Sequence, residues 1–257
     1  IREVDAIVHV LRCFEESDIT HVDGDVDPVR DAQTVETELM LADIDSIERR
    51  VTALAKKSRG GDAESKADLK LLEKLLTNLS DGKPARNTFG LTDAEQKRLP
   101  KLHLLTAKPT LYVCNVAESD AASGNDYTRK VADMAAKQQA GHVIVSAAIE
   151  AEISQLDAND KTEFLAELNI EEAGLVRLIR AGYGLLDLLT FFTVGPKEAH
   201  AWTVANGATA PQAAGVIHTD FQRGFIRAET ISYNDYIAYK GEAGAKDAGK
   251  FRVKAQN

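Results

Sequence analysis

Two apolar segments near the middle of the chain limit the folds that are open to it. Residues 111–114 form a continuous apolar run that ends in Asn115, and residues 141–145 form a second run that ends in Ser146. Between them, residues 126–139 place apolar side chains every three or four positions, which is typical of a helix with one buried face. A strand, a helix and a strand in this order predict a βαβ crossover in a parallel sheet.

Polar residues follow both strands, at the edge of the sheet where open α/β proteins bind ligands. After the first strand come Asn115, Val116 and, two residues later, Glu118. GTPases carry Asn-Lys-x-Asp at such a place, and the short carboxylate accepts two N–H groups of guanine. Here Val116 replaces the Lys, and Glu118 is one methylene longer than Asp. Because adenine lacks the amine at C2, a site for adenine does not need a closely placed Asp. We interpret this loop as a purine site that no longer selects guanine. An ordinary turn at the end of a strand is the alternative interpretation.

A second loop, formed by Ser146, Ala147 and Ala148, follows the second strand. In P-loop GTPases a Ser-Ala loop at this place packs its backbone over the base, opposite the Asn loop. We therefore expect these three residues and the Asn115 loop to bind a nucleotide base together.

Motifs along the whole chain resemble those of the Obg-like ATPases, the ATP-preferring branch of the Obg GTPases. They lie at residues 5–14, 108–118, 179–183, 201–204, 210–221 and 224–229, and APQAAGVIHTDF at 210–221 is the most specific. The resemblance implies an α/β fold. Its parts are a partial P-loop GTPase-type doubly wound sheet, an inserted coiled-coil-like helical hairpin and a C-terminal β-grasp (TGS) domain. It also implies ATP or GTP with Mg²⁺ as cofactor.

The phosphate half of such a site is missing from the sequence. No Gly-Lys-Ser or Gly-Lys-Thr occurs, so the Lys and the hydroxyl that hold the phosphates and Mg²⁺ in P-loop proteins are absent. No Asp-x-x-Gly follows a strand, and the chain opens at Ile1 without Met. We expect the chain to be an interior part of a longer protein. Alone it would be inactive as an ATPase, and it contains no Mg²⁺ ligands.

Apolar spacing divides the chain into four segments. We assign residues 1–24 to a first part of the G domain, 25–105 to the inserted helical domain, 106–190 to the rest of the G domain and 191–257 to the TGS domain. The inserted domain has apolar stripes with heptad-like spacing on both sides of Gly60-Gly61.

Local motifs predict where several elements begin. Asp27-Pro28 is expected to open the first long helix, and Thr92-x-x-Glu95 a further short helix. We expect strands at 4–12, 191–194, 199–204 and 225–231, with a helix at 211–217.

His21 is the strongest candidate for a catalytic role. It lies on the loop after the strand predicted at 4–12, where the resemblance implies a His that orients the attacking water. A neutral imidazole can accept a hydrogen bond from water, since its unperturbed pKa is about 6.5. A surface role is the alternative for His21. We expect His9, inside the strand, and the pair His218 and Asp220 to be structural.

Composition restricts the environment and the partners. A formal charge of −9 and a pI of about 5.2 argue against broad nucleic-acid binding, and neither DNA nor a membrane is expected as a partner. The two cysteines, Cys13 and Cys114, lie in apolar strands. We expect them to be reduced packing residues in a cytoplasmic protein, with no metal site.

The resemblance makes the ribosome, as its large subunit or the whole particle, the expected partner. Basic residues toward the hairpin tip form either a solvated face or a contact with ribosomal RNA; they are Arg49, Arg50, Lys56, Lys57 and Arg59, next to Lys66 and Lys70. Two functions follow. The first is a ribosome-associated P-loop NTPase that hydrolyses ATP or GTP as a translation- or stress-linked switch. The second is a catalytically inert interaction module, helical hairpin plus TGS domain, with a remnant G domain.

Overall fold

The computed structural model describes residues 2–16, 24–58 and 62–255. The chain divides into two compact units, Ile1–Leu186 and Asp187–Asn257. Each unit is described by itself.

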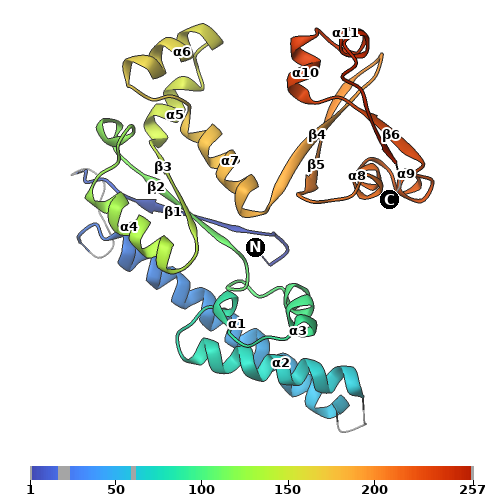
Figure 1. Cartoon of the computed structure of the whole chain (residues 1–257). Helices are drawn as coiled ribbons and strands as arrows, with labels where there is room; N and C mark the ends of the chain where they lie inside the picture. Colours follow the sequence, from blue (N-terminus) through green and yellow to red (C-terminus); the bar gives the residue numbers. More distant parts are fainter. Residues whose placement is uncertain (1, 17–23, 59–61, 256–257) are drawn as a thin grey trace. The chain divides into compact units, whose positions relative to one another are not determined.

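A three-stranded parallel sheet lies at the centre of the first unit (Figure 1). Its order is β1 (Ile7–Arg12), β2 (Thr110–Asn115) and β3 (Gly141–Val145), and β2 is buried along almost its whole length. Helix α4 (Asp126–Lys137) connects β2 to β3, which confirms the predicted βαβ crossover and parallel sheet.

Strand β1 is shorter than predicted, because it begins at Ile7 and not at residue 4. Its first partner is Thr110, and the Ile7 N–H donates to the carbonyl of Pro109. The chain turns before Pro109, so residues 4–6 have no residues of β2 with which to pair. β1 lies at the edge of this sheet, where Val8 and Val10 are exposed.

Helices cover both faces of the sheet. Helix α4 and the start of α1 (Pro28–Ser58) pack on one face, and α7 (Gly174–Leu185) packs on β2 and β3 from the other (Figure 1). Two shorter helices, α5 (Ala147–Ile153) and α6 (Ala158–Glu167), lie between β3 and α7 in sequence. Our prediction had not assigned α5, α6 or α7.

The segment between β1 and β2 is helical. Helix α1 packs along α2 (Ala63–Ser80), and their shared core is completed by Ala85 and Leu104; from the two helices it contains Met40, Ile47, Leu71, Leu72, Leu75 and Leu79. The Asp27 carboxylate accepts the N–H groups of Val29 and Arg30, so Asp27 caps α1 as predicted. Gly60-Gly61 and Arg59 lie outside the described residues.

Short helices return the chain from α2 to the sheet: η1 (Ala85–Asn87), α3 (Asp93–Arg98) and η2 (Leu99–Leu102). Thr92 and Glu95 form the capping box that the sequence predicted at the start of α3. Glu95 also accepts two hydrogen bonds of 2.8 Å from the Lys74 ammonium on α2, which holds α3 against the hairpin.

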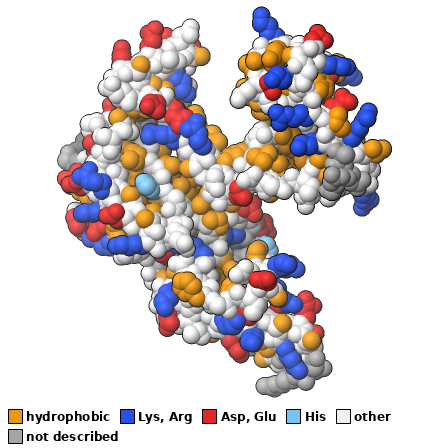
Figure 2. Space-filling model, in the orientation of Figure 1, with side chains coloured by type: hydrophobic (Ala, Val, Ile, Leu, Met, Phe, Trp, Pro, Cys, Tyr) orange, Lys and Arg blue, Asp and Glu red, His pale blue; other side chains and the backbone are white. Residues whose placement is uncertain are grey.

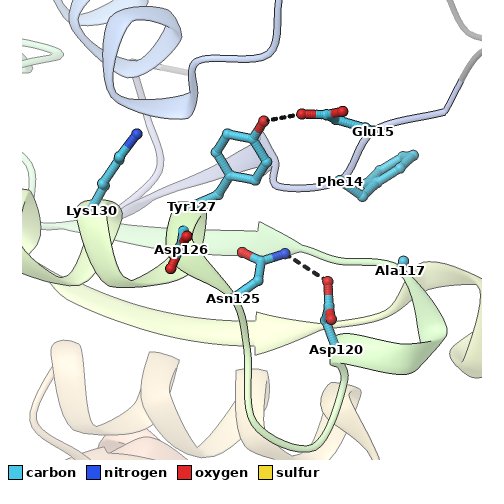
Figure 3. A pocket seen from close by; sticks show the side chains of 8 residues that line it. All are labelled: Phe14, Glu15, Ala117, Asp120, Asn125, Asp126, Tyr127 and Lys130. Atoms are coloured by element: carbon cyan, nitrogen blue, oxygen red, sulfur yellow. Dashed lines mark hydrogen bonds between the residues drawn. The ribbon is translucent and has the colours of Figure 1, made fainter.

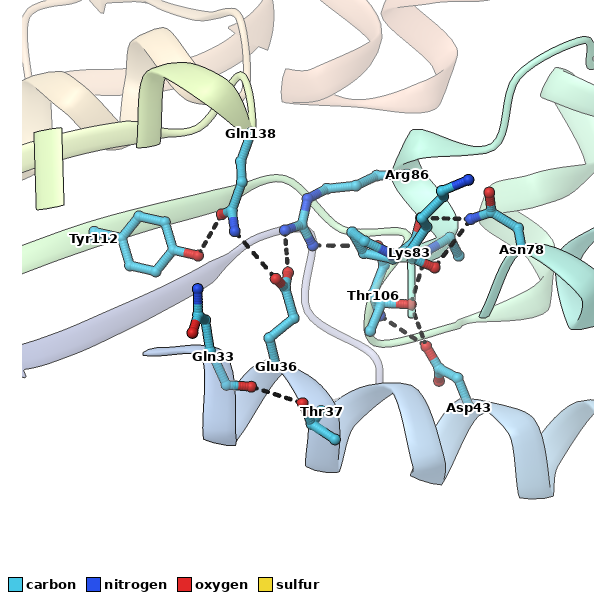
Figure 4. Close-up of polar contacts among 12 residues, drawn as sticks. Gln33, Glu36, Thr37, Asp43, Asn78, Lys83, Arg86, Thr106, Tyr112 and Gln138 are labelled. Atoms are coloured by element: carbon cyan, nitrogen blue, oxygen red, sulfur yellow. Dashed lines mark hydrogen bonds and ion pairs between the residues drawn. The ribbon is translucent and has the colours of Figure 1, made fainter. Parts of the chain in front are cut away.

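Two carboxylates on α1 attach the helical segment to the sheet (Figure 4). Asp43 is fully buried and accepts hydrogen bonds from the N–H of Leu105 and from both the N–H and the hydroxyl of Thr106, at 2.8–2.9 Å. Two turns earlier, Glu36 pairs with Arg86 of η1.

The Glu36 carboxylate also reaches the sheet through α4. It accepts a hydrogen bond from the Gln138 amide, whose oxygen accepts the Tyr112 hydroxyl of β2 at 2.7 Å. Helix α1 is therefore bonded both to the segment before β2 and to β2 itself.

The second unit contains two antiparallel strand pairs. β4 (Leu188–Val194) pairs with β5 (Ala199–Ala205), and β6 (Arg227–Thr230) pairs with β7 (Arg252–Ala255). Helices α8 (Ala210–Ile217), α9 (Thr219–Arg223), α10 (Tyr233–Ala238) and α11 (Glu242–Asp247) complete it. The described strands do not join into one sheet, whereas a β-grasp domain has a single sheet. Among the described residues, no helix has the length and apolar character that crossing a membrane requires.

Candidate functional site

The two predicted base loops meet at the carboxyl ends of β2 and β3. The Asn115 side-chain oxygen accepts the backbone N–H of Ala147 at 2.9 Å. The N–H of Val116 donates to the carbonyl of Val145, also at 2.9 Å. The loop after β2 is thus bonded to the loop after β3 through one side chain and one backbone group.

Ser146 occupies the centre of this arrangement. It is 3% exposed, and its hydroxyl has no hydrogen-bond partner among the described residues. Buried hydroxyls are normally paired, so Ser146 is an exception within the described residues. Ala147 and Ala148 are exposed beside it and offer a small apolar surface.

The remaining predicted site residues lie apart from this contact. Glu118 is the first residue of η3 (Glu118–Asp120); its side chain is exposed and makes no hydrogen bond within the described part of the chain. Val116 is buried. His21 lies outside the described residues.

The other histidines have structural surroundings. The ring centroid of His9 lies 5.8 Å from that of Tyr112, and burial lowers the pKa of this imidazole. His218 caps α9, because its Nδ1 accepts the N–H of Asp220 at 3.2 Å. Both observations agree with the structural roles that the sequence predicted.

A cavity of about 480 Å³ lies beside the Asn115 loop (Figure 3). It is bounded by Phe14 and Glu15 after β1, by Ala117 and Asp120, and by residues 125–127 and Lys130 of α4. The Tyr127 hydroxyl donates a hydrogen bond to Glu15, which joins the α4 side of the cavity to the segment after β1.

Asn125 organises this region, and our sequence reasoning missed it. Its amide donates to the carbonyl of Cys13 and to the carboxylate of Asp120, both at 2.8 Å. It thereby ties the end of β1 to the loop after β2. A signal was available in the sequence, because Asn125 and Thr128 have the spacing of a capping box, which the structure contains.

Cys13 and Cys114 are both free and fully buried at the ends of neighbouring strands. A hydrogen bond to Cys114, together with burial, raises the pKa of the Cys13 thiol. Within the described residues, no group of three or more His, Cys, Asp or Glu side chains could hold a metal ion.

Comparison with known proteins agrees with this geometry. Residues 188–257 match the family YchF-GTPase_C, described as a protein of unknown function (DUF933). The chain is 52% identical over 257 residues to the ribosome-binding ATPase YchF of Haemophilus influenzae, and 47% identical over 258 residues to that of Bacillus subtilis. Each match covers 100% of this chain and 70% of the relative.

A solved structure gives the same result for the fold. The YchF GTPase of Schizosaccharomyces pombe superimposes with a TM-score of 0.84 at 34% identity, covering 100% of this chain and 70% of that one. The parallel sheet and the motifs of this chain are therefore those of a known group of proteins, and the chain belongs to the YchF family.

Proposed function

We propose that this protein is a ribosome-associated P-loop NTPase, which hydrolyses ATP or GTP as a switch linked to translation or stress. Its relatives are named ribosome-binding ATPases. The observation that carries the nucleotide part is the hydrogen bond between Asn115 and Ala147, because it assembles a base site from two loops.

The proposed mode of base binding follows from the orientation of the Asn115 amide. Its oxygen accepts the Ala147 N–H, so its NH₂ group remains as a donor. Purine N7 is an acceptor in adenine and guanine alike, and this donor serves both bases. Because the N–H of Val116 is bonded to Val145, its backbone contribution is limited to the carbonyl.

Guanine selection would need a carboxylate fixed beside the base. Glu118 is exposed and unsupported among the described residues, so it does not provide such a group. The exposed Ala147 and Ala148 offer a small apolar surface that suits the flat face of a purine. We infer that ATP binds at least as well as GTP.

The phosphates and Mg²⁺ require residues that this sequence lacks, since it contains no Gly-Lys-Ser or Gly-Lys-Thr. When bound, the nucleotide supplies the phosphoryl group that is transferred to water. We propose that His21 orients this water, and we assign no phosphate or metal contact to the described residues.

The other segments are proposed to serve the ribosome. We propose that residues 25–105 act as an inserted helical docking domain and that residues 191–257 act as a TGS-type domain of a cytoplasmic protein. The inert-module alternative would not require the link between Asn115 and Ala147, and it has no observation in its favour.

Calorimetric titration of ATP and GTP into the full-length protein tests the proposal. ATP should bind at least as tightly as GTP. Asn115→Ala should weaken both nucleotides by about tenfold, since one hydrogen bond in a buried site contributes about 1–1.5 kcal/mol. Ser119→Ala, an exposed change in the same loop, is the matched control. A preference for GTP of more than tenfold would contradict the base assignment.

A further inference from the structure

A second cavity, of about 650 Å³, lies in the helical segment, where α3 and η2 cross α1 and α2. Its apolar surface combines side chains from all of these helices: Ala53, Leu54, Leu72, Ala94 and Leu102. We call this cavity the crossing groove. No residue assigned to the nucleotide site lines it.

Charged side chains surround the apolar surface of the crossing groove. The basic ones are Arg50, Lys97, Arg98 and Lys101, and the acidic ones are Glu64 and Asp68. Arg98 forms an ion pair with Asp68 and a longer one, of 3.9 Å, with Glu64. Arg98 therefore faces both carboxylates, and the four basic and two acidic side chains give the rim a net formal charge of +2.

The other three basic side chains of the rim are available to pair with an anionic ligand. Arg50, Lys97 and Lys101 make no ion pair within the residues that the structure describes. The groove thus combines an aliphatic surface with a net positive rim. Figure 2 shows basic, acidic and apolar side chains interspersed over the face of the molecule that it draws.

The groove is held open by the protein itself. The Lys74–Glu95 and Arg98–Asp68 ion pairs each join α2 to α3, which forms one wall. Glu95 is only 8% exposed and is also fixed by its capping box with Thr92. A wall that is fixed beforehand lowers the entropic cost of binding.

The lining distinguishes between anionic partners. None of the described residues that line the groove is aromatic, whereas proteins that bind single-stranded nucleic acid stack bases on aromatic rings. Phosphates alone would need the cations but not an apolar surface of this extent. An amphipathic helix places aliphatic side chains on one face and charges beside them, and it docks in grooves of this kind.

We propose that the crossing groove binds an acidic amphipathic segment of a partner protein. Its Leu, Ile or Met side chains would contact Leu54 and Leu102, which are only partly buried. Its Asp or Glu side chains would pair with Arg50, Lys97 and Lys101.

Fluorescence anisotropy with the 257-residue chain tests this proposal. The probe is a labelled peptide of about four helical turns, built from Glu, Ala and Leu with Leu at every third or fourth position. It should bind with a Kd of about 1–100 μM, weakened by salt. A peptide of the same composition with scrambled Leu positions should bind at least about tenfold more weakly.

Variants separate the groove from the rest of the helical segment. Ala53→Phe fills the apolar surface without changing charge, and Lys97→Glu with Lys101→Glu reverses the rim. Each should raise the Kd at least about tenfold. Lys66→Glu with Lys70→Glu makes the same charge change on α2 outside the groove and should change the Kd by less than about twofold. Far-UV circular dichroism confirms that each variant is folded.

Three results would overturn the proposal. The first is that the peptide does not bind, and the second is that the groove and control variants lose the same affinity for the peptide. The third is that a single-stranded RNA oligonucleotide, or the fatty acid anion dodecanoate, displaces the labelled peptide more effectively than unlabelled peptide does. In the full-length protein Ala53→Phe should leave ATP affinity unchanged, so failure here is distinguishable from failure of the nucleotide site.

Discussion

Asp43 provides the sharpest test of how the helical segment is attached to the sheet. Its carboxylate is fully buried and accepts three hydrogen bonds from Leu105 and Thr106, plus one of 3.2 Å from Arg2. Asp43→Ala removes all four acceptor contacts. The two backbone N–H groups then remain buried without a partner.

The expected cost follows from those two donors. Each buried unsatisfied N–H costs about 1–3 kcal/mol, so Asp43→Ala should lower the free energy of unfolding by about 2–6 kcal/mol. Asp43→Asn keeps one acceptor but turns an NH₂ group toward donors, and it should cost about 2–3 kcal/mol. Asp45→Ala, an exposed change on the same helix, should stay within about 0.5 kcal/mol of wild type.

Urea unfolding followed by two probes measures this. Far-UV circular dichroism reports the helices, and fluorescence of Trp202, the single Trp, reports the second unit. With a denaturant slope of about 2 kcal/mol per M, the circular dichroism midpoint of Asp43→Ala should fall by about 1–3 M. The Trp202 transition should move less. If Asp43→Ala and Asp45→Ala unfold at the same urea concentration, these buried hydrogen bonds do not hold the segment.

Three further outcomes are expected. The hydrogen bond from Lys74 is the main cause that lowers the pKa of Glu95 from 4.5 to about 2, so its stabilising effect is complete above about pH 5 and is lost as pH falls toward 2. In urea titrations at several pH values, the difference between wild type and Glu95→Gln should shrink over that range; a constant difference would argue against the pair. Iodoacetamide should modify Cys13 and Cys114 slowly in the native protein and rapidly in urea, because both are buried, as mass spectrometry of timed samples would show. In the full-length protein His21→Ala should lower ATP turnover in a phosphate-release assay and leave ATP affinity nearly unchanged, since a water-orienting group acts in the transition state; an unchanged turnover would remove its catalytic assignment.

The sequence predicted features whose physical cause is local. Continuous apolar runs identified β2 and β3, and capping residues such as Asp27 and Thr92 identified where helices begin. These signals depend on neighbours within four positions. The meeting of Asn115 with the Ser146 loop also followed from the sequence, because the carboxyl ends of adjacent parallel strands lie at one edge.

Contacts between distant residues could not be predicted in this way. Asp43 and Thr106 are 63 positions apart. The pattern of apolar residues in an amphipathic helix does not distinguish a buried Asp from an exposed one. The same holds for Glu36, whose partners Arg86 and Gln138 lie 50 and 102 positions away. The start of β1 was wrong for a related reason, since it is fixed by where β2 begins.

Helix α1 has a mechanical consequence, because it is long and is bonded to the rest of the unit at Glu36 in its first half and at Asp43 near its middle. Its 31 residues span about 46 Å, and the part beyond Asp43 extends about 22 Å. It can therefore act as a lever: a tilt of about 5° around Asp43 moves the far end by about 2 Å. The arm before Asp43 carries Glu36, which is linked through Gln138 and Tyr112 to the strand that ends in Asn115. A partner that tilts the arm beyond Asp43 should change nucleotide affinity, and by thermodynamic reciprocity the nucleotide should change affinity for that partner.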